Sequence, residues 1–143
     1  MKAKNTFVAV HALIKKGDKY LFTKRSPKND YMPNIWDIPG GTIEFGEELI
    51  SALKREVKEE VNLKINPKKI IYAYGFVSNV NRHQFQLVYL CDYASGDVKL
   101  NSEEHSEYKW LKKAEFESLK KIAFLNNLIK EFSLELAKQV KLC

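Results

Sequence analysis

The chain has 143 residues, of which 45% are hydrophobic and 29% charged, and its formal net charge is +6 at pH 7. These values are typical of a soluble globular protein with one domain over residues 1–143, and they exclude disordered and fibrous classes. The longest uncharged apolar run, residues 7–14, is far shorter than the roughly 18 residues that cross a bilayer, which excludes a membrane span.

The chain begins with a pattern typical of a β-hairpin. Residues 7–16 and 19–24 predict two strands, and Gly17 and Asp18 between them form a two-residue turn signal. Residues 29–41 follow, with two prolines and a pair of glycines, and we expect a connection without helix there.

A helix is predicted over residues 47–61. Leu49, Leu53, Val57 and Val61 recur every four residues, and the segment contains no Gly or Pro. These four side chains define the face that we expect to lie against the core.

The rest of the chain predicts further strands and a final helix. Residues 69–77 and 83–93 form a second hairpin after a loop that ends at Pro67, and residues 108–111 add a short strand. Apolar side chains four positions apart over residues 123–140 predict an amphipathic helix. Since no linker or repeat interrupts the chain, we expect strands and helices to share one core as an α/β sandwich.

Acidic residues are concentrated on and before the first predicted helix. Within 17 positions the chain carries 6 of its 18 acids, namely Glu44, Glu47, Glu48, Glu56, Glu59 and Glu60. On a helical wheel Glu60 falls within the apolar arc, Glu56 at its border and Glu59 beside them. Like charges at this spacing repel, and burial raises the cost, so a cation should compensate them.

A hard divalent cation suits such a cluster of carboxylates. Mg²⁺ prefers oxygen ligands and is usually held by one or two carboxylates together with substrate phosphates. The alternative is a solvated charged face, in which these acids pair with neighbouring lysines and Arg55.

The acidic helix belongs to a longer pattern of residues. Gly41 is followed after five residues by Glu47, and after seven more by an Arg-Glu-Val-Lys-Glu-Glu run at residues 55–60. This pattern resembles the signature of the Nudix hydrolases, which include the MutT-like proteins, and the Trp-Asp-Ile-Pro-Gly-Gly run at residues 36–41 resembles the usual approach to it. Asn62 replaces a glycine of the signature. Asn tolerates the left-handed backbone at a helix end, so we expect the change to be tolerated.

The resemblance implies a fold and a set of site residues. The fold would be a Nudix-type α/β/α sandwich with a mixed β-sheet between helices. The residues implied to hold Mg²⁺, or Mn²⁺ in its place, are Gly40 through its carbonyl, Glu56, Glu59, Glu60 and, from outside the signature, Glu104. Catalysis would fall to Glu56 as base, with Glu59 and Glu60 and with Arg55 orienting the carboxylates; Glu104 and Glu107 are alternative bases. Glu47 would support the junction between loop and helix.

The implied reaction is hydrolysis of a diphosphate linkage in a nucleoside diphosphate derivative. Residues 77–81 lack the Pro of ADP-ribose hydrolases and the Tyr of dinucleoside polyphosphate hydrolases, which favours a (d)NTP or modified nucleotide converted to a monophosphate and pyrophosphate. Candidate substrate-binding residues are Arg25 for phosphate, Tyr31, Trp36 and Phe76 for base stacking, and Asn126 for the base edge. The competing interpretation makes the aromatics core residues, and Arg25 and Asn126 solvated ones.

Partners and alternatives follow from charge and composition. The excess of 21 Lys over 3 Arg favours an anionic partner such as a phosphorylated small molecule. The lysines are scattered rather than gathered with aromatics into a strip, which argues against nucleic acid. Two cysteines without a disulfide or zinc pattern favour a cytoplasmic location. Open alternatives are a nucleotide- or RNA-binding module, a hydrolase of RNA 5′ ends or nucleotide sugars, and a homodimer.

Overall fold

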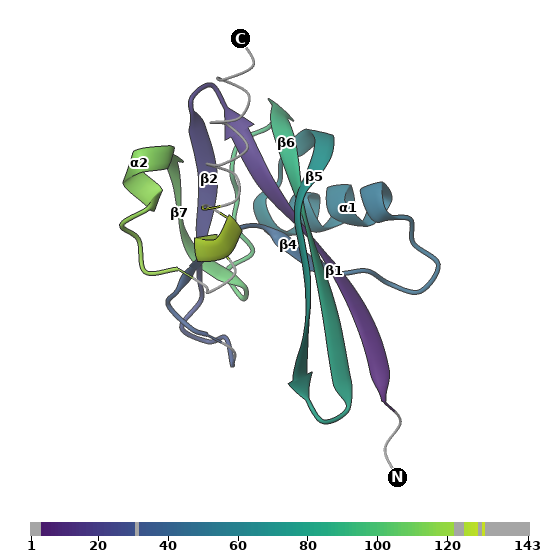
Figure 1. Ribbon diagram of the computed structural model, residues 1–143. Helices are drawn as coiled ribbons and strands as arrows, with labels where there is room; N and C mark the ends of the chain where they lie inside the picture. The colour runs from purple at the N-terminus through teal and green to yellow at the C-terminus, as the bar shows by residue number, and fades with distance from the viewer. Residues whose placement is uncertain (1–3, 31, 122–124, 129, 131–143) are drawn as a thin grey trace.

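A mixed β-sheet runs through the molecule in the computed structural model, which describes residues 4–30, 32–121, 125–128 and 130 (Figure 1). Within these residues the elements are β1 (Asn5–Lys16), β2 (Lys19–Arg25), β3 (Trp36–Asp37), β4 (Gly40–Thr42), α1 (Leu49–Val61), β5 (Lys64–Asn79), β6 (Arg82–Ser95), β7 (His105–Lys112) and α2 (Lys113–Phe116). The strand order is β3-β2-β1-β6-β5, with β4 paired to β1 and β7 paired to β2. Strands β1 and β6 are parallel and the other pairs antiparallel, so the sheet is mixed as expected.

Strands β1 and β2 separate soon after their turn. Their pairing is confined to Lys15 with Tyr20 and Lys16 with Lys19, around a turn in which Gly17 has φ of +63°. Farther along, β4 pairs with β1 and β3 pairs with β2, so the connection after β2 fills the space between the diverging strands (Figure 1). The predicted hairpin is confirmed, and the divergence places the glycine pair of β4 next to α1.

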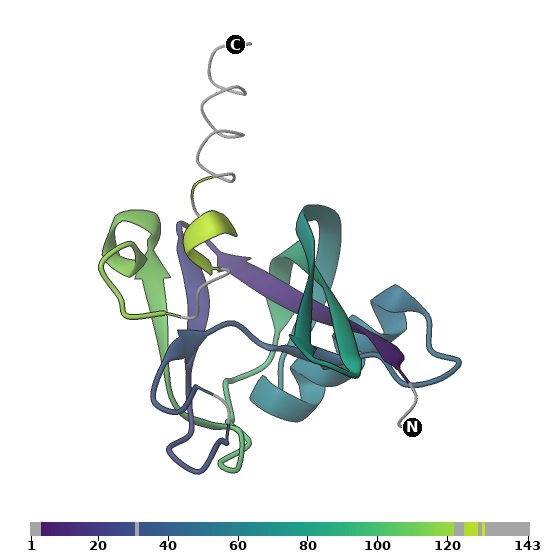
Figure 2. The same cartoon turned by 60° about the horizontal axis from the view of Figure 1, so that its bottom comes forward.

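The core lies on both faces of the sheet. On one face Val10, Ala12 and Ile14 of β1 pack with Leu53 and Val57 of α1. On the other face the buried residues include Leu13, Phe22, Ile38, Phe116, Leu125 and Leu128. Helix α1 therefore covers one face, while α2 and the helical residues 125–128 lie over the other, as in an α/β/α sandwich (Figure 2).

Helix α1 begins two residues later than predicted and ends as expected. Asn62 follows it with φ of +63°, and its N–H donates to the Lys58 carbonyl at 3.1 Å. The prediction that Asn62 adopts the left-handed conformation is confirmed. Leu49, which we expected in the core, is 36% exposed. Leu49 is the first residue of α1, and the buried residues of the helix are Ala52, Leu53, Val57, Glu60 and Val61.

Strand β5 differs most from the prediction. It begins at Lys64 and includes Pro67, which we had placed at the end of a loop. Among the described strands β5 pairs only with β6, and its register shifts between Pro67 and Lys69, so the missing N–H of Pro67 is tolerated. The short strands β3 and β4 were not predicted, and β7 is longer than residues 108–111.

The predicted helix over residues 123–140 lies largely outside the described residues. Of that segment, residues 125–128 are helical, with Leu125 and Leu128 buried. In the part of the chain that is described, no helix has the length and apolar character that a membrane span requires.

Candidate active site on helix α1

Arg55 organises the carboxylates on the outer side of α1. Its Nε and Nη2 each donate to one oxygen of Glu47 at 2.7 Å, which makes a bidentate pair. Its Nη1 donates to Glu56 Oε1 at 3.0 Å and to Glu59 Oε2 at 3.2 Å. One guanidinium therefore fixes the loop before the helix and two carboxylates on the helix.

The pKa values of this group follow from those bonds. The hydrogen bond from Arg55 lowers the pKa of Glu47 to about 2, and the backbone N–H of Glu44 adds to the shift. The same pair raises the pKa of Arg55. By contrast the pKa of Glu56 is raised, first by burial and then by the negative charge of Glu60.

Glu60 occupies the inner side of α1. Its side chain lies in the buried face, as the helical wheel predicted, with the residue 9% exposed. Its Oε2 accepts a hydrogen bond from the N–H of Gly40 at 3.0 Å and lies 3.2 Å from His105 Nε2. The carboxylate is thus held by β4 and by the first residue of β7.

The two glycines of β4 allow two different close approaches. A Cβ atom on Gly41 would overlap the carboxylate of Glu56 in α1, and one on Gly40 would overlap the Val10 carbonyl oxygen and the His11 ring in β1. A side chain at position 41 would therefore displace the helix or its carboxylate, and one at position 40 would displace β4 from β1. The close approach of α1 explains the glycine of the signature at position 41.

Asn101 and Glu104 connect the loop before β7, which carries Glu103 and Glu104, to the same site. The N–H of Asn101 donates to the Glu60 carbonyl at 3.0 Å, and its own carbonyl accepts the N–H of Glu104 at 3.0 Å. The Glu104 carbonyl in turn accepts the backbone N–H of Ser26 and the side chain of Asn29, each at 2.9 Å. Glu104 itself is exposed, one residue from His105.

The donor chemistry of this region fits a hard cation. Arg55 carries one positive charge and lies within 4 Å of four carboxylates, those of Glu44, Glu47, Glu56 and Glu59. Among the described residues, however, no three acid, His or Cys side chains are arranged to enclose an ion. In this arrangement Arg55 holds Glu56, while Gly40 and His105 hold Glu60. The carboxylates therefore outnumber the positive charge near them, and the pKa of Glu56 is raised. Mg²⁺ prefers oxygen ligands of this kind.

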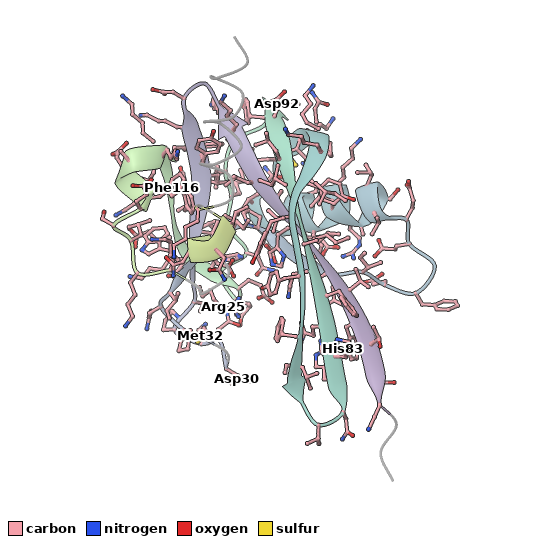
Figure 3. The ribbon with its side chains drawn as sticks, in the orientation of Figure 1. Arg25, Asp30, Met32, His83, Asp92 and Phe116 are labelled. Carbon is pink, nitrogen blue, oxygen red and sulfur yellow. The ribbon has the colours of Figure 1, made fainter. Side chains whose placement is uncertain are left out.

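The candidate substrate-binding residues are more dispersed. Arg25, where β2 ends, donates to Asp37 Oδ2 at 3.2 Å and to Asn29 Oδ1 at 3.1 Å (Figure 3). Trp36 is buried in the core on the face opposite α1, as the competing interpretation had it. Phe76 is half-buried and stacks on Tyr74 with ring centroids 5.7 Å apart. Asn126 is exposed, and Tyr31 lies outside the described residues.

Sequence reasoning missed the role of His105. It opens β7, is 4% exposed and contacts Glu60. The available signal was its position directly after Glu103 and Glu104, at the start of a run with strand character. That local signal does not identify Glu60 as the partner of His105, because the two residues lie 45 positions apart in the sequence.

Three comparisons with known proteins agree with this arrangement. A family model described as the NUDIX domain matches residues 5–132. The chain is 33% identical over 121 residues to an ADP-ribose pyrophosphatase of Methanocaldococcus jannaschii, covering 82% of this chain and 66% of that relative. It is 30% identical over 112 residues to the nucleoside triphosphatase NudI of Escherichia coli, covering 70% and 77%. Of solved structures, a MutT protein from Methanosarcina mazei Go1 has a TM-score of 0.81 at 28% identity, covering 94% and 98%.

Proposed function

Because this chain belongs to the Nudix hydrolase family, we propose that it hydrolyses a diphosphate linkage in a nucleoside diphosphate derivative with the help of Mg²⁺. The preferred substrate is a (d)NTP or modified nucleotide, with a monophosphate and pyrophosphate as products. The observation that carries this proposal is the half-buried Glu56 carboxylate, which lies against Gly41 and between the charges of Arg55 and Glu60.

The residues proposed to hold the cation are Glu56, Glu59, Glu60, the carbonyl of Gly40 and Glu104. When bound there, Mg²⁺ or Mn²⁺ would neutralise charge on the bridging and leaving oxygens of the diphosphate.

The protein's own contribution is to place a base and hold it. Burial and the charge of Glu60 raise the pKa of Glu56, which makes its carboxylate a better proton acceptor for an attacking water. Arg55 donates to Glu56 Oε1 at 3.0 Å and so restricts the orientation of that carboxylate. Glu104 and Glu107 are the alternative bases. Arg25 is proposed to contact a phosphate of the substrate, with aromatic residues such as Phe76 facing the base.

A second substrate is favoured by the relatives. The M. jannaschii relative is named an ADP-ribose pyrophosphatase, so ADP-ribose is the second candidate for this chain. Residues 77–81, which lack the Pro expected of ADP-ribose hydrolases, favour the nucleoside triphosphate over it. Both substrates contain the same linkage, and they differ in the group that leaves.

The test is a hydrolysis panel with product identification. Canonical and modified (d)NTPs, ADP-ribose, nucleotide sugars and 5′-triphosphate RNA are incubated with the protein and Mg²⁺. We expect pyrophosphate and a nucleoside monophosphate from a (d)NTP, and loss of this activity in Glu59→Gln and Glu60→Gln. Glu117→Gln, a change at an exposed acid outside the site, serves as the matched control.

Two results would overturn the proposal. A wild-type protein that binds nucleotide and hydrolyses none of the panel would be a binding module. Full activity in both Glu59→Gln and Glu60→Gln would show that neither carboxylate holds a cation needed for the reaction. A single domain, a homodimer and a cytoplasmic location stay predictions of the sequence.

A further inference from the structure

His105 is a buried histidine outside the Nudix signature that contacts the signature helix. It is the first residue of β7, where it pairs in register with Arg25 of β2. Its Nε2 lies 3.2 Å from Glu60 Oε2, and only 4% of its surface is exposed. The contact is therefore shielded from water on both sides.

The donor in this contact follows from the chemistry of the two groups. A carboxylate only accepts hydrogen bonds when it is ionised, so with Glu60 in that form Nε2 of His105 is the donor. Its Nδ1 is buried and has no hydrogen-bond partner within the described part of the chain. With the N–H of Gly40 also donating at 3.0 Å, Glu60 Oε2 receives two hydrogen bonds. A carboxylate oxygen has two lone pairs, so Oε1 is the oxygen of Glu60 that would remain available to a cation.

The backbone around His105 is attached to Glu60 as well. Asn101 donates its N–H to the Glu60 carbonyl at 3.0 Å and accepts the N–H groups of Glu104 at 3.0 Å and His105 at 2.9 Å. The segment that carries Glu104 is thus joined to Glu60 at the main chain through Asn101 and at the side chain through His105. Movement of either contact would change the distance between the Glu60 and Glu104 carboxylates.

We propose that His105 is a positioning residue for the cation site: it holds Oε2 of Glu60 and thereby presents Oε1 to the metal, and it keeps the Glu104 segment beside α1. This inference rests on the proposed function in one respect, since it takes Glu60 as a metal ligand. His105 itself touches neither substrate nor metal.

The test measures Mn²⁺ binding to the purified full chain without nucleotide, by electron paramagnetic resonance of the free ion. His105→Phe keeps an aromatic ring and removes the donor. We expect its Mn²⁺ affinity to fall by about 10- to 100-fold, the usual effect of removing a partner of a metal ligand. We expect kcat to fall with it, while KM for the nucleotide at saturating metal stays close to the wild-type value.

A pair of amide variants separates positioning from packing. The amide of His105→Gln reaches the place of Nε2, so this variant should bind Mn²⁺ nearly as the wild type does. The amide of His105→Asn reaches only the place of Nδ1, so this variant should resemble His105→Phe. His83→Phe is the matched control, because His83 is an exposed residue near the tip of the β5–β6 hairpin and should be unaffected (Figure 3).

The outcomes separate this inference from the proposed function. Wild-type Mn²⁺ affinity in His105→Phe, or equal affinity in His105→Gln and His105→Asn, would overturn it even if the wild type hydrolyses nucleotides. Should His105→Phe not fold, as judged by thermal unfolding, the two amide variants decide. Histidine-dependent Mn²⁺ binding in a protein that hydrolyses no nucleotide would sustain the inference and refute only the proposed function.

Discussion

The two sides of α1 hold their carboxylates with different kinds of partner. On the outer side, the Arg55 guanidinium bonds Glu47, Glu56 and Glu59 at 2.7 to 3.2 Å. On the inner side, Glu60 accepts hydrogen bonds from the backbone of Gly40 and the ring of His105. The outer partner is a full positive charge, and Gly40 on the inner side is a neutral dipole.

This difference separates two tasks. A guanidinium stabilises the charged form of its partner, and the pKa of Glu47 accordingly falls to about 2. A backbone N–H orients a carboxylate while leaving most of its charge uncompensated, and burial followed by the charge of Glu60 raises the pKa of Glu56. The outer side thus gives rigidity, and the inner side keeps negative charge available for a cation.

The largest expected effect comes from Glu56→Gln, which changes the carboxylate that accepts a hydrogen bond from Arg55 and lies near the charge of Glu60. We expect activity to fall on the order of 10³-fold, about 4 kcal/mol of transition-state stabilisation, because a ligand and the base are lost together. Steady-state kinetics with Mg²⁺ measures it. Activity near the wild-type value would assign both roles to other carboxylates.

The same variant should be more stable than the wild type in EDTA at neutral pH. The folded-state pKa of Glu56 is raised, so its ionisation opposes folding as the pH rises through that pKa. Thermal unfolding should show the gain of Glu56→Gln at neutral pH and its disappearance below the unfolded pKa of 4.5, where the wild-type carboxyl is protonated in both states.

Arg55→Lys tests the outer side alone. Lysine keeps the charge but cannot donate to both oxygens of Glu47 and also to Glu56, so orientation is lost while neutralisation remains. We expect activity to fall by about 10- to 100-fold, as for other partners of metal ligands. The measurement is kcat/KM with Mg²⁺, with Lys58→Arg on the same helix as control. Unchanged kcat/KM would show that charge alone suffices.

A smaller effect concerns the pH dependence of stability through Glu47. Its pKa is about 2 when folded and 4.5 unfolded, so the stabilisation is fully present above pH 4.5 and disappears as the pH falls through about 2. Glu47→Gln should therefore unfold more easily than the wild type in urea at neutral pH, and the difference should vanish as the pH falls below about 2. A constant difference across this range would contradict the Arg55 pair as the cause.

The smallest effect is expected at Asn62, beyond the end of α1. Ala in its left-handed conformation costs about 1 kcal/mol, so Asn62→Ala should lower the free energy of unfolding by that amount. Asn62→Gly restores the glycine of the signature and should match or exceed the wild type. Urea denaturation measures both. Neither variant should change activity, and a loss of activity would mean that this helix end contributes to the site.

The sequence predicted those parts of the fold that repeat a pattern over many residues. The spacing of Leu53, Val57 and Val61 predicted α1, and the turn at Gly17 predicted the first hairpin. Strands β3 and β4 have two and three residues, too few to show alternation. Pro67 was misassigned because its tolerance depends on β5 being an edge strand, which is a property of the assembled sheet.

In the candidate site, too, the sequence predicted what a local pattern carries and missed the contacts between distant segments. The wheel predicted Glu60 in the buried face, because Glu60 shares a helix with the residues that define that face. The partners of Glu60, Gly40 and His105, lie 20 and 45 residues away, and no local pattern pairs them with it. Metal binding by these residues stays a prediction of the sequence.

The distance along the chain between these partners has a consequence for the order of events during synthesis. The signature is complete once residue 63 has left the ribosome, but His105 and the Asn101 carbonyl emerge about 40 residues later. Until then Glu60 lacks its donor from β7 and its link to Glu104. A nascent chain halted before β7 would therefore carry every signature residue while the Glu60 side chain and main chain still lack their contacts with His105 and Asn101.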